Sequence, residues 1–327
     1  MFNNMVKIDL KDRKILYQLD LNARQSLMQI GKKVNLAKNV VAYRIDRLKE
    51  NGIIKNFYSH IDAYKLGYIS FRLYVSYQYT TPEIEKEIID YFINNKCIWR
   101  VITIKGRFDL GITMWVKDTN SYYSFWSETM NKFGDYFTDR TFSACIQSFD
   151  YRNSYLLPGE YKKSDRELFE LTGGGKKTEI DAINLKILDV LAENARAPLI
   201  EIAKCLGASP SMISYRIKDL QKLGIIQGFR TDMDTSKLGY RHFKVDIYLR
   251  EHKQRYKIIN YIKFNPNLVH ISTSSGISDI ELEFHVEHVN QLYEIMKDLV
   301  VKFPNAIRNY KHFTIQQVHK IRYMPEI

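Results

Sequence analysis

The feature that most constrains this sequence is an internal repeat. Residues 8–68 align with residues 180–240 at a constant offset of 172, without a gap, and 25 of the 61 aligned pairs are identical. The most similar stretch reads YRIDRLKENGIIKNF at Tyr43–Phe57 and YRIKDLQKLGIIQGF at Tyr215–Phe229. An offset of this length far exceeds the period of a solenoid, so it indicates a duplicated domain rather than a repeat array. The 327 residues therefore hold two copies of one fold.

Each copy begins with a pattern of three helices. Asp9 and Asp181 are favourable N-caps for a first helix, and a short second helix follows. Ser209 caps a third helix in copy two, whereas Ala37 at the matching position of copy one makes a weaker cap. One face of the third helix is apolar and is expected to pack on the first two helices; it carries Val41, Ile45 and Leu48, or Ile213, Ile217 and Leu220.

The segments after the third helices complete this first unit. Gly52 and Gly224 stop the helices, and IIKNFYSHID and IIQGFRTDMD then predict a strand and a wing. Three helices with a tight second turn, followed by a wing, are typical of a winged helix-turn-helix.

The solvent face of the third helix has the side chains that a DNA reader needs. Small, amide, hydroxyl and aromatic groups suit base edges and phosphates in a major groove. Arg44 and Arg216 flank the apolar face, where a guanidinium reaches either a phosphate or a neighbouring carboxylate. The net charge of +12 favours an anionic partner, although a merely solvated polar face is the alternative. The predicted DNA-contacting residues are Lys38, Asn39, Ala42, Tyr43, Arg44 and Arg47 in copy one, and Ser211, Ser214, Tyr215, Arg216 and Lys218 in copy two.

The second unit of each copy has the order β-α-β-β-α-β, which predicts a ferredoxin-like sandwich. In copy two, Ile280, Leu282 and Phe284 alternate with polar residues. We expect the two sheets to pack against each other within the chain and to bury these apolar residues, because one sheet alone would expose too large an apolar patch.

The predicted fold class is α+β, with two winged helix-turn-helix domains and two ferredoxin-like domains arranged as an intrachain pseudo-dimer. The expected boundaries are 1–68 and 180–240 for the helix-turn-helix domains, and 69–157 and 241–327 for the ferredoxin-like domains. Residues 158–179 form a linker, in which Ser164 and Glu167 make a capping box for a short helix that Gly173 ends.

Motifs for other functions are weak. The three cysteines form no CxxC pair or disulfide framework, and no apolar run is long enough to span a bilayer, so we expect a cytoplasmic protein without a membrane partner. His285 and His288 have the only metal-like spacing, and a surface pair is the expected reading. No P-loop, nucleotide fingerprint or nucleophile elbow occurs, so no catalytic residue, cofactor or metal is assigned and the chain is not expected to be an enzyme.

These motifs together resemble the Lrp/AsnC family of transcription regulators. The resemblance depends on IDLKDRKILYQLDLNAR, YRIDRLKENGIIKNF, KLGY and the turn GRFD at Gly106–Asp109; copy two repeats them, with GISD at Gly276–Asp279. It implies that the winged helix binds double-stranded DNA and that the second domain dimerises through its sheet. It also implies an amino-acid effector near the turns, at Gly106, Asp109, Gly276 and Asp279.

The departure from the family pattern is that one chain holds both copies. A fused dimer binds two half-sites about one helical turn apart. The half-sites can differ, because Asn39, Ala42 and Asp46 are replaced by Ser211, Ser214 and Lys218. Residues 1–68 contain 13 Lys and Arg against 6 Asp and Glu, whereas residues 180–240 contain 8 against 7. We therefore expect the first reader to dominate DNA affinity; a second copy that has lost DNA binding is the alternative, and further self-association stays open.

A competing resemblance exists to siroheme decarboxylases, which combine the same domains. Such an enzyme would need histidines and arginines that converge on a tetrapyrrole, and the candidates are His242, His270, His285 and Arg241. The turn of copy one follows the regulator pattern, and copy one has no histidine-rich strand, so the regulator is the preferred interpretation.

Overall fold

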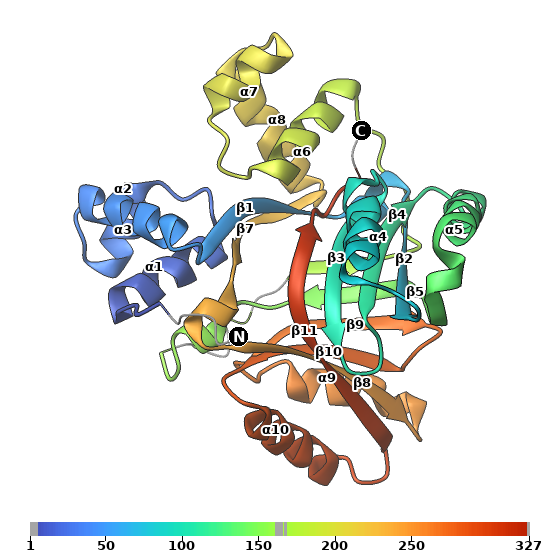
Figure 1. Ribbon diagram of the computed structural model, residues 1–327. Helices are drawn as coiled ribbons and strands as arrows, with labels where there is room; N and C mark the ends of the chain where they lie inside the picture. Colours follow the sequence, from blue (N-terminus) through green and yellow to red (C-terminus); the bar gives the residue numbers. More distant parts are fainter. Residues whose placement is uncertain (1–5, 161–165, 167–168, 326–327) are drawn as a thin grey trace.

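The computed structural model (Figure 1) describes residues 6–160, 166 and 169–325. We call the three-helix unit of each copy a reader. The first reader consists of α1 (Leu10–Leu21), α2 (Leu27–Val34) and α3 (Lys38–Glu50). The second reader consists of α6 (Ala182–Glu193), α7 (Leu199–Leu206) and α8 (Pro210–Lys222). Asp9, Asp181 and Ser209 accept N-cap hydrogen bonds as predicted, and Ala37 gives α3 no side-chain cap. The apolar faces of α3 and α8 are buried against their neighbours, also as predicted.

The strand that follows each reader pairs with the other copy. Strand β1 (Ile54–Ile61) and strand β7 (Ile226–Met233) form a two-stranded antiparallel sheet in which Tyr58 lies opposite Arg230. The blue and yellow readers lie at opposite ends of this ribbon in Figure 1. The wing was therefore predicted incorrectly in one respect: each copy supplies a single strand, and its partner is the matching strand 172 residues away.

Each second unit has the predicted β-α-β-β-α-β order. Copy one comprises β2 (Ile69–Tyr77), α4 (Pro82–Asn94), β3 (Ile98–Lys105), β4 (Leu110–Val116), α5 (Thr119–Phe133) and β5 (Phe137–Asp150). Copy two comprises β8 (Arg241–Leu249), α9 (Arg255–Ile262), β9 (Leu268–Ser275), β10 (Ile280–Val286), α10 (Val289–Lys302) and β11 (Ile307–Ile321). The fold class is thus α+β, as predicted.

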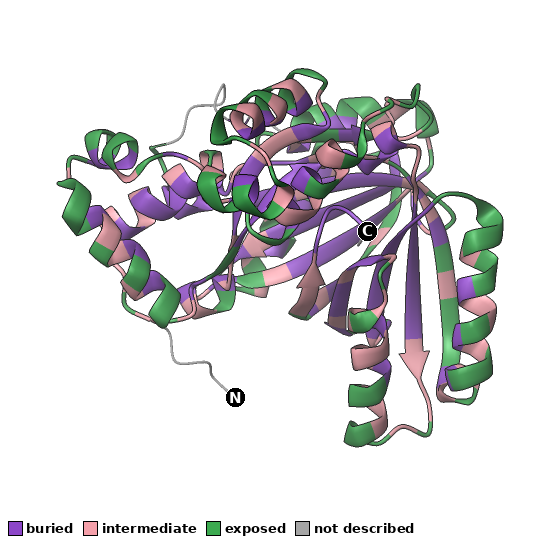
Figure 2. Cartoon of the chain, turned by 90° about the horizontal axis from the view of Figure 1, so that it is seen from above, coloured by how far each residue is buried: buried purple, intermediate pink, exposed green. Residues whose placement is uncertain are grey.

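The two sheets join into a closed ring. The strand order is β2-β4-β3-β11-β8-β10-β9-β5, and β5 also pairs with β2. Copy one meets copy two at β3–β11 and at β5–β9, both antiparallel. The helices lie outside the ring, where Figure 2 shows their outer faces exposed and the strands largely buried. The pseudo-dimer is therefore held by continuous backbone hydrogen bonds between the copies.

The apolar residues of β10 face the helices, whereas we expected them to face the other sheet. Ile280, Leu282 and Phe284 are fully buried, but in the core that β10 forms with α9 and α10. The face that copy two presents to copy one carries the alternate residues, including Glu281 and Glu283. The sheets do face each other, and the surface between them combines these charged residues with an apolar cluster from both copies that includes Tyr74, Ile102 and Phe313.

The linker differs from the prediction as well. Phe169–Thr172 forms a short strand, β6, which pairs with the end of β5, with Phe169 opposite Asp150. The predicted capping box at Ser164 and Glu167 lies outside the described residues. Phe169 occupies the space where a side chain at Gly228 would stand, so the linker packs directly on β7. No helix in the described part of the chain is long and apolar enough to cross a membrane.

Candidate nucleic-acid interface and barrel interior

The predicted base-reading residues lie together on the outer faces of α3 and α8. Tyr43 and Tyr215, which match in the repeat, expose 66% and 70% of their surface. Lys38, Asn39, Ser211 and Lys218 are exposed beside them, and Ala42 and Ser214 are partly exposed. Both copies therefore present an open face of the composition that suits a major groove.

The arginines next to these faces bind carboxylates of their own reader. Arg44 Nη1 lies 2.8 Å from Asp9 and 2.9 Å from Asp12, and Arg47 Nη2 lies 2.6 Å from Asp12. Arg216 Nη1 lies 2.6 Å from Asp181. The sequence did not decide whether Arg44 and Arg216 bind a phosphate or a carboxylate. In the structure both arginines bind carboxylates, and so they join the reading helix to the N-terminus of the first helix. Although burial raises the pKa of Asp9, the Asp12 amide and Arg44 hold it below its usual value.

Reciprocal contacts hold the two readers to each other. Arg24 donates to the carbonyls of Ala195 and Ala197, and the matching Arg196 donates to those of Ala23 and Gln25. Lysines repeat this pattern at the ribbon ends: Lys65 Nζ donates to Leu223 O at 2.8 Å and Lys237 Nζ to Asn51 O at 2.7 Å. We refer to Arg24, Arg196, Lys65 and Lys237 as the clasp. Because every clasp contact has a counterpart at the same offset, the readers are related by an approximate twofold axis and fixed in spacing.

The interior of the strand ring contains a buried ionic network. Glu281, fully buried on β10, accepts hydrogen bonds from Arg72 and Lys244. Glu283, two residues on, accepts two bonds of 2.8 Å from Arg100. Burial alone would raise the pKa of Glu281, but Arg72 and Lys244 lower it to about 2, so both glutamates stay ionised.

The network is divided unequally between the copies. Both glutamates lie on β10 of copy two, whereas Arg72 and Arg100 lie on β2 and β3 of copy one. At the positions matching Glu281 and Glu283, copy one has Gly111 and Thr113. The alternation of charged and apolar residues in IELEFHV was the sequence signal for this interior, but it did not reveal where the counter-charges lie.

Histidines gather in the same interior. The rings of His242 and His285 are 4.5 Å apart, and His285 Nδ1 lies 2.9 Å from the Tyr155 hydroxyl. His270 and His60 both contact the buried carboxylate of Asp150, at 3.1 and 2.8 Å. Three of the four residues that we had considered for a tetrapyrrole thus face the interior, and Arg241 is exposed. Copy one contributes His60, which sequence reasoning missed because it lies on a reader strand.

The protonation state of the buried histidines follows from their burial. Burial lowers the pKa of His60, His242 and His285, so these rings are neutral at pH 7. Among the described residues, no group of three His, Cys, Asp or Glu side chains is placed to hold a metal ion. His288 is the N-cap of α10, accepting from Gln291 N–H, and does not join His285.

The two Gly-x-x-Asp turns come together at one cavity. Gly106 and Gly276 have φ angles of 141° and 134°, which favour glycine. Asp109 and Asp279, however, accept hydrogen bonds from the Tyr77 and Leu249 amides and so hold the two turns to the ends of the neighbouring strands β2 and β8. A cavity of about 320 Å³ lies between the turns; its lining includes Arg107 from the first turn, Gly276 from the second, and Tyr248, Arg308 and Lys311.

A buried carboxylate lies on β8, the strand that contributes Tyr248 to the lining of this cavity. Asp246 is 1% exposed, and neither of its oxygens has a hydrogen-bond partner among the described residues. It lies opposite Lys311 in the β8–β11 register and two residues before Tyr248, which lines the cavity. Burial and the nearby Glu281 raise the pKa of Asp246 to about 6. A buried, unpaired acid of this kind is a candidate for ligand binding.

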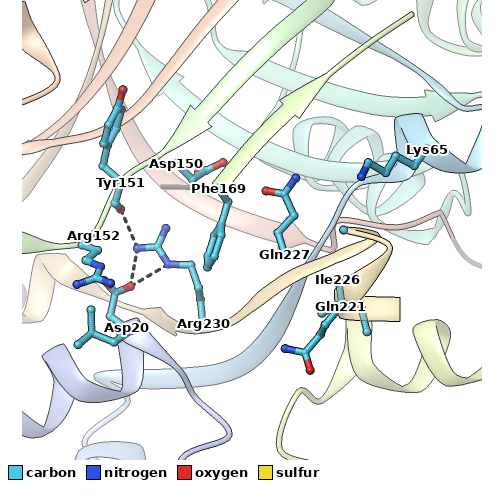
Figure 3. Close-up of a pocket in the computed structure, with 12 residues that line it drawn as sticks. Asp20, Lys65, Asp150, Tyr151, Arg152, Phe169, Gln221, Ile226, Gln227 and Arg230 are labelled. Carbon is cyan, nitrogen blue, oxygen red and sulfur yellow. Dashed lines mark hydrogen bonds and ion pairs between the residues drawn. The ribbon is translucent and has the colours of Figure 1, made fainter. Parts of the chain in front are cut away.

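A larger cavity of about 510 Å³ lies where the readers, the ring and the linker meet (Figure 3). Arg230 on β7 forms an ion pair of 2.5 Å with Asp20 on α1 and donates to the carbonyl of Tyr151. Phe169 of the linker forms part of the wall. This buried contact connects the first reader, the ribbon and the end of β5.

Comparisons with known proteins agree with this geometry in two ways. A family model described as winged helix-turn-helix DNA-binding matches residues 8–55 and 180–227. The chain is 31% identical over 118 residues to regulatory protein AsnC of Haemophilus influenzae, covering 36% of this chain and 79% of that one. It is 43% identical over 61 residues to the regulator LrpA of Pyrococcus abyssi, covering 19% of this chain and 43% of that protein.

The crystal structure of the siroheme decarboxylase NirDL matches nearly the whole chain. The TM-score is 0.62 at 12% identity, over 96% of this chain and 94% of that one. Our expectation that a chain of this kind is not an enzyme is therefore wrong, because the same architecture is that of an enzyme. At this identity the likeness concerns the fold alone.

Two matches to the winged-helix model, each over a reader with an open reading face, agree with the similarity to AsnC. The chain belongs to the Lrp/AsnC family of DNA-binding regulators and carries two copies of the family's fold in one polypeptide.

Proposed function

We propose that the chain is a sequence-specific transcriptional regulator that binds both half-sites of an operator at once. The observation that carries the proposal is the matched pair of exposed reading faces, on α3 and α8, joined by the β1–β7 ribbon and the clasp. A twofold pair of reading helices is the arrangement by which helix-turn-helix dimers read two half-sites. Because both readers are in one chain, the second binds at high effective concentration and weak half-sites suffice.

Selection of bound sequences from random duplex DNA, with the full chain, tests this function. We expect a motif of two half-sites whose centres are about 10 base pairs, or one helical turn, apart. An unselected pool of sequences would rule the proposal out.

The first reader should contribute more to the salt dependence of binding. Lys38 is exposed at the start of α3, and its counterpart in copy two is Pro210. If Lys38 contacts a phosphate, Lys38→Ala should reduce the slope of log affinity against log salt by about 0.9. Lys86→Ala, on the exposed outside of α4, is the control that should leave the slope unchanged. An unchanged slope in Lys38→Ala would remove Lys38 from the interface. Arg44 and Arg47 are unsuitable for this test, because they hold α3 to α1.

The cavity between the turns is a better candidate site for an amino-acid effector than the two turn aspartates are. Arg107, Arg308 and Lys311 line the cavity and offer cations to a carboxylate. Asp246 is not in the lining, but it is two residues before Tyr248, which is, and its unpaired carboxylate suits an ammonium group. Support for this assignment comes from the family likeness and from the unpaired state of Asp246, whereas Asp109 and Asp279 already hold amides. Thermal shifts with the twenty amino acids test it, and no shift with any of them would exclude an amino-acid effector.

Asp246→Asn should stabilise the free protein and abolish the effector's thermal shift. The pKa of Asp246 is raised from 3.8 to about 6, so ionisation destabilises the fold, and stability is lost as pH rises through about 6. We expect the variant to be more stable at pH 8 by on the order of 1–3 kcal/mol, with the difference vanishing below about pH 4. Urea unfolding at both pH values measures this. A variant that is equally stable, or that keeps the effector's shift, would contradict the role of Asp246.

A second candidate function is suggested by the histidines and arginines inside the ring, in the fold that NirDL shares. A carboxylate-bearing tetrapyrrole would have to displace Glu281 and Glu283 from Arg72 and Arg100, because these cations are already paired. Titration with siroheme and absorbance spectroscopy distinguish the candidates. A spectral shift that disappears in His242→Ala would favour tetrapyrrole binding, and an unchanged spectrum would oppose it.

A further inference from the structure

Charge inverts between the copies at three matched positions of α3 and α8, which are Asp46 and Lys218, Arg47 and Asp219, and Glu50 and Lys222. Asp46 on α3 and Lys218 on α8 match at the offset of 172, and both are exposed. Tyr43 and Tyr215, one turn earlier on the same face, are identical. Asp46 forms an ion pair of 3.3 Å with Lys49, and the two side chains are 64% and 47% exposed. Such surface pairs are weak and break readily, so the Asp46 carboxylate is available to a ligand.

We propose that Asp46 and Lys218 make the chain read a non-palindromic operator, with cytosine at the matched position of the first half-site and guanine at that of the second. This inference rests on the proposed function. A carboxylate only accepts hydrogen bonds, and in the major groove cytosine offers the N4 amino donor. An ammonium only donates, and guanine offers the O6 and N7 acceptors. The two side chains therefore prefer opposite bases at one position.

The neighbouring differences do not have this effect. Arg47 is replaced by Asp219, but Arg47 is bound to the buried Asp12 of its own reader. Asn39 and Ser211 each donate and accept hydrogen bonds, so neither excludes a base by its charge. Glu50 and Lys222 also differ in charge, but they are the last residues of α3 and α8, whereas a recognition helix contacts base edges from its N-terminal part. The inversion at Asp46 and Lys218 is thus the difference with a definite consequence for the base sequence that is read.

The fixed geometry of the readers makes the positions comparable. The clasp and the ribbon hold the reading helices about an approximate twofold axis, so Asp46 and Lys218 meet equivalent steps of their half-sites. In a symmetric dimer both positions would select the same base. Here the difference of one residue sets the orientation in which the chain lies on its operator.

The test combines selection from random duplex DNA with two variants of the full chain. The wild type should return a motif with cytosine in one half-site and guanine at the equivalent position of the other. Asp46→Lys should return guanine in both and Lys218→Asp cytosine in both. Competition between the matched operators should show a preference of about tenfold for the cognate base in each protein.

The control is Lys49→Ala, which removes the neighbour of Asp46 and should leave the base preference intact. A wild-type motif with the same base in both half-sites would overturn the inference while leaving the proposed function in place. So would variants that change affinity equally for all operators, because this would indicate contact with phosphates only. An unselected pool would overturn both.

Discussion

Replacing Glu281 with alanine should lower the free energy of unfolding by about 3–5 kcal/mol, because removing one partner of a buried ion pair leaves the others without a counter-charge. Arg72 and Lys244, both buried, would keep their charges in the interior of the ring. Urea unfolding at pH 7 measures the loss. The matched control is Asp90→Ala, which breaks the exposed pair with Lys86 and should cost less than about 1 kcal/mol.

The pH dependence gives an independent check on the same group. The pKa of Glu281 is depressed from 4.5 to about 2, so its contribution is fully present above pH 4.5 and is lost as pH falls toward 2. Wild type should therefore lose stability over this range more steeply than Glu281→Ala. If stability fell equally steeply with pH in both proteins, or if the variant lost less than about 1 kcal/mol of unfolding free energy at pH 7, the prediction would be wrong. The interior would then tolerate unpaired cations, through water or rearrangement.

Changing the distance between the operator half-sites should abolish two-site binding at every insertion length. The readers are joined by the β1–β7 ribbon and the clasp rather than by a flexible tether. Inserting about 5 base pairs turns one half-site to the opposite side of the duplex, and about 10 base pairs moves it roughly 34 Å along the axis. We expect affinity to fall to that of a single half-site in both cases, by 100-fold or more.

Band-shift titration of operators with insertions of increasing length measures this effect. The control variant combines Arg24→Ala with Arg196→Ala. It removes the two arginines of the clasp and leaves the reading faces unchanged. Recovery of affinity at one full turn in the wild type would show that the readers move apart on DNA, contrary to the fixed spacing inferred from the clasp.

Local patterns in the sequence predicted the elements well. The repeat, the capping residues and the order of strands and helices gave the readers and the ferredoxin-like units, because these depend on neighbours within a few residues. The alternation around Ile280 also identified β10, but not which face meets copy one. Sheets with helices outside bury both faces, so alternation alone cannot distinguish them.

The features that escaped prediction depend on partners distant in the chain. The partner of β1 is β7, and the partner of Glu283 is Arg100, 183 residues away. Likewise, the sequence left a phosphate or a neighbouring carboxylate open for Arg44, and the fold places it beside Asp9 and Asp12. The turn aspartates resembled ligand groups in the sequence, but Asp109 and Asp279 hold backbone amides, whereas Asp246 carried no motif at all.

The uneven division of charge inside the ring determines what each half can associate with. Two copies of the second unit would place Glu281 and Glu283 opposite the same two glutamates, and two copies of the first would place Arg72 and Arg100 together without these glutamates. Neither half can replace the other in these ion pairs, so the division of charge favours pairing of the two different copies over pairing of two like copies.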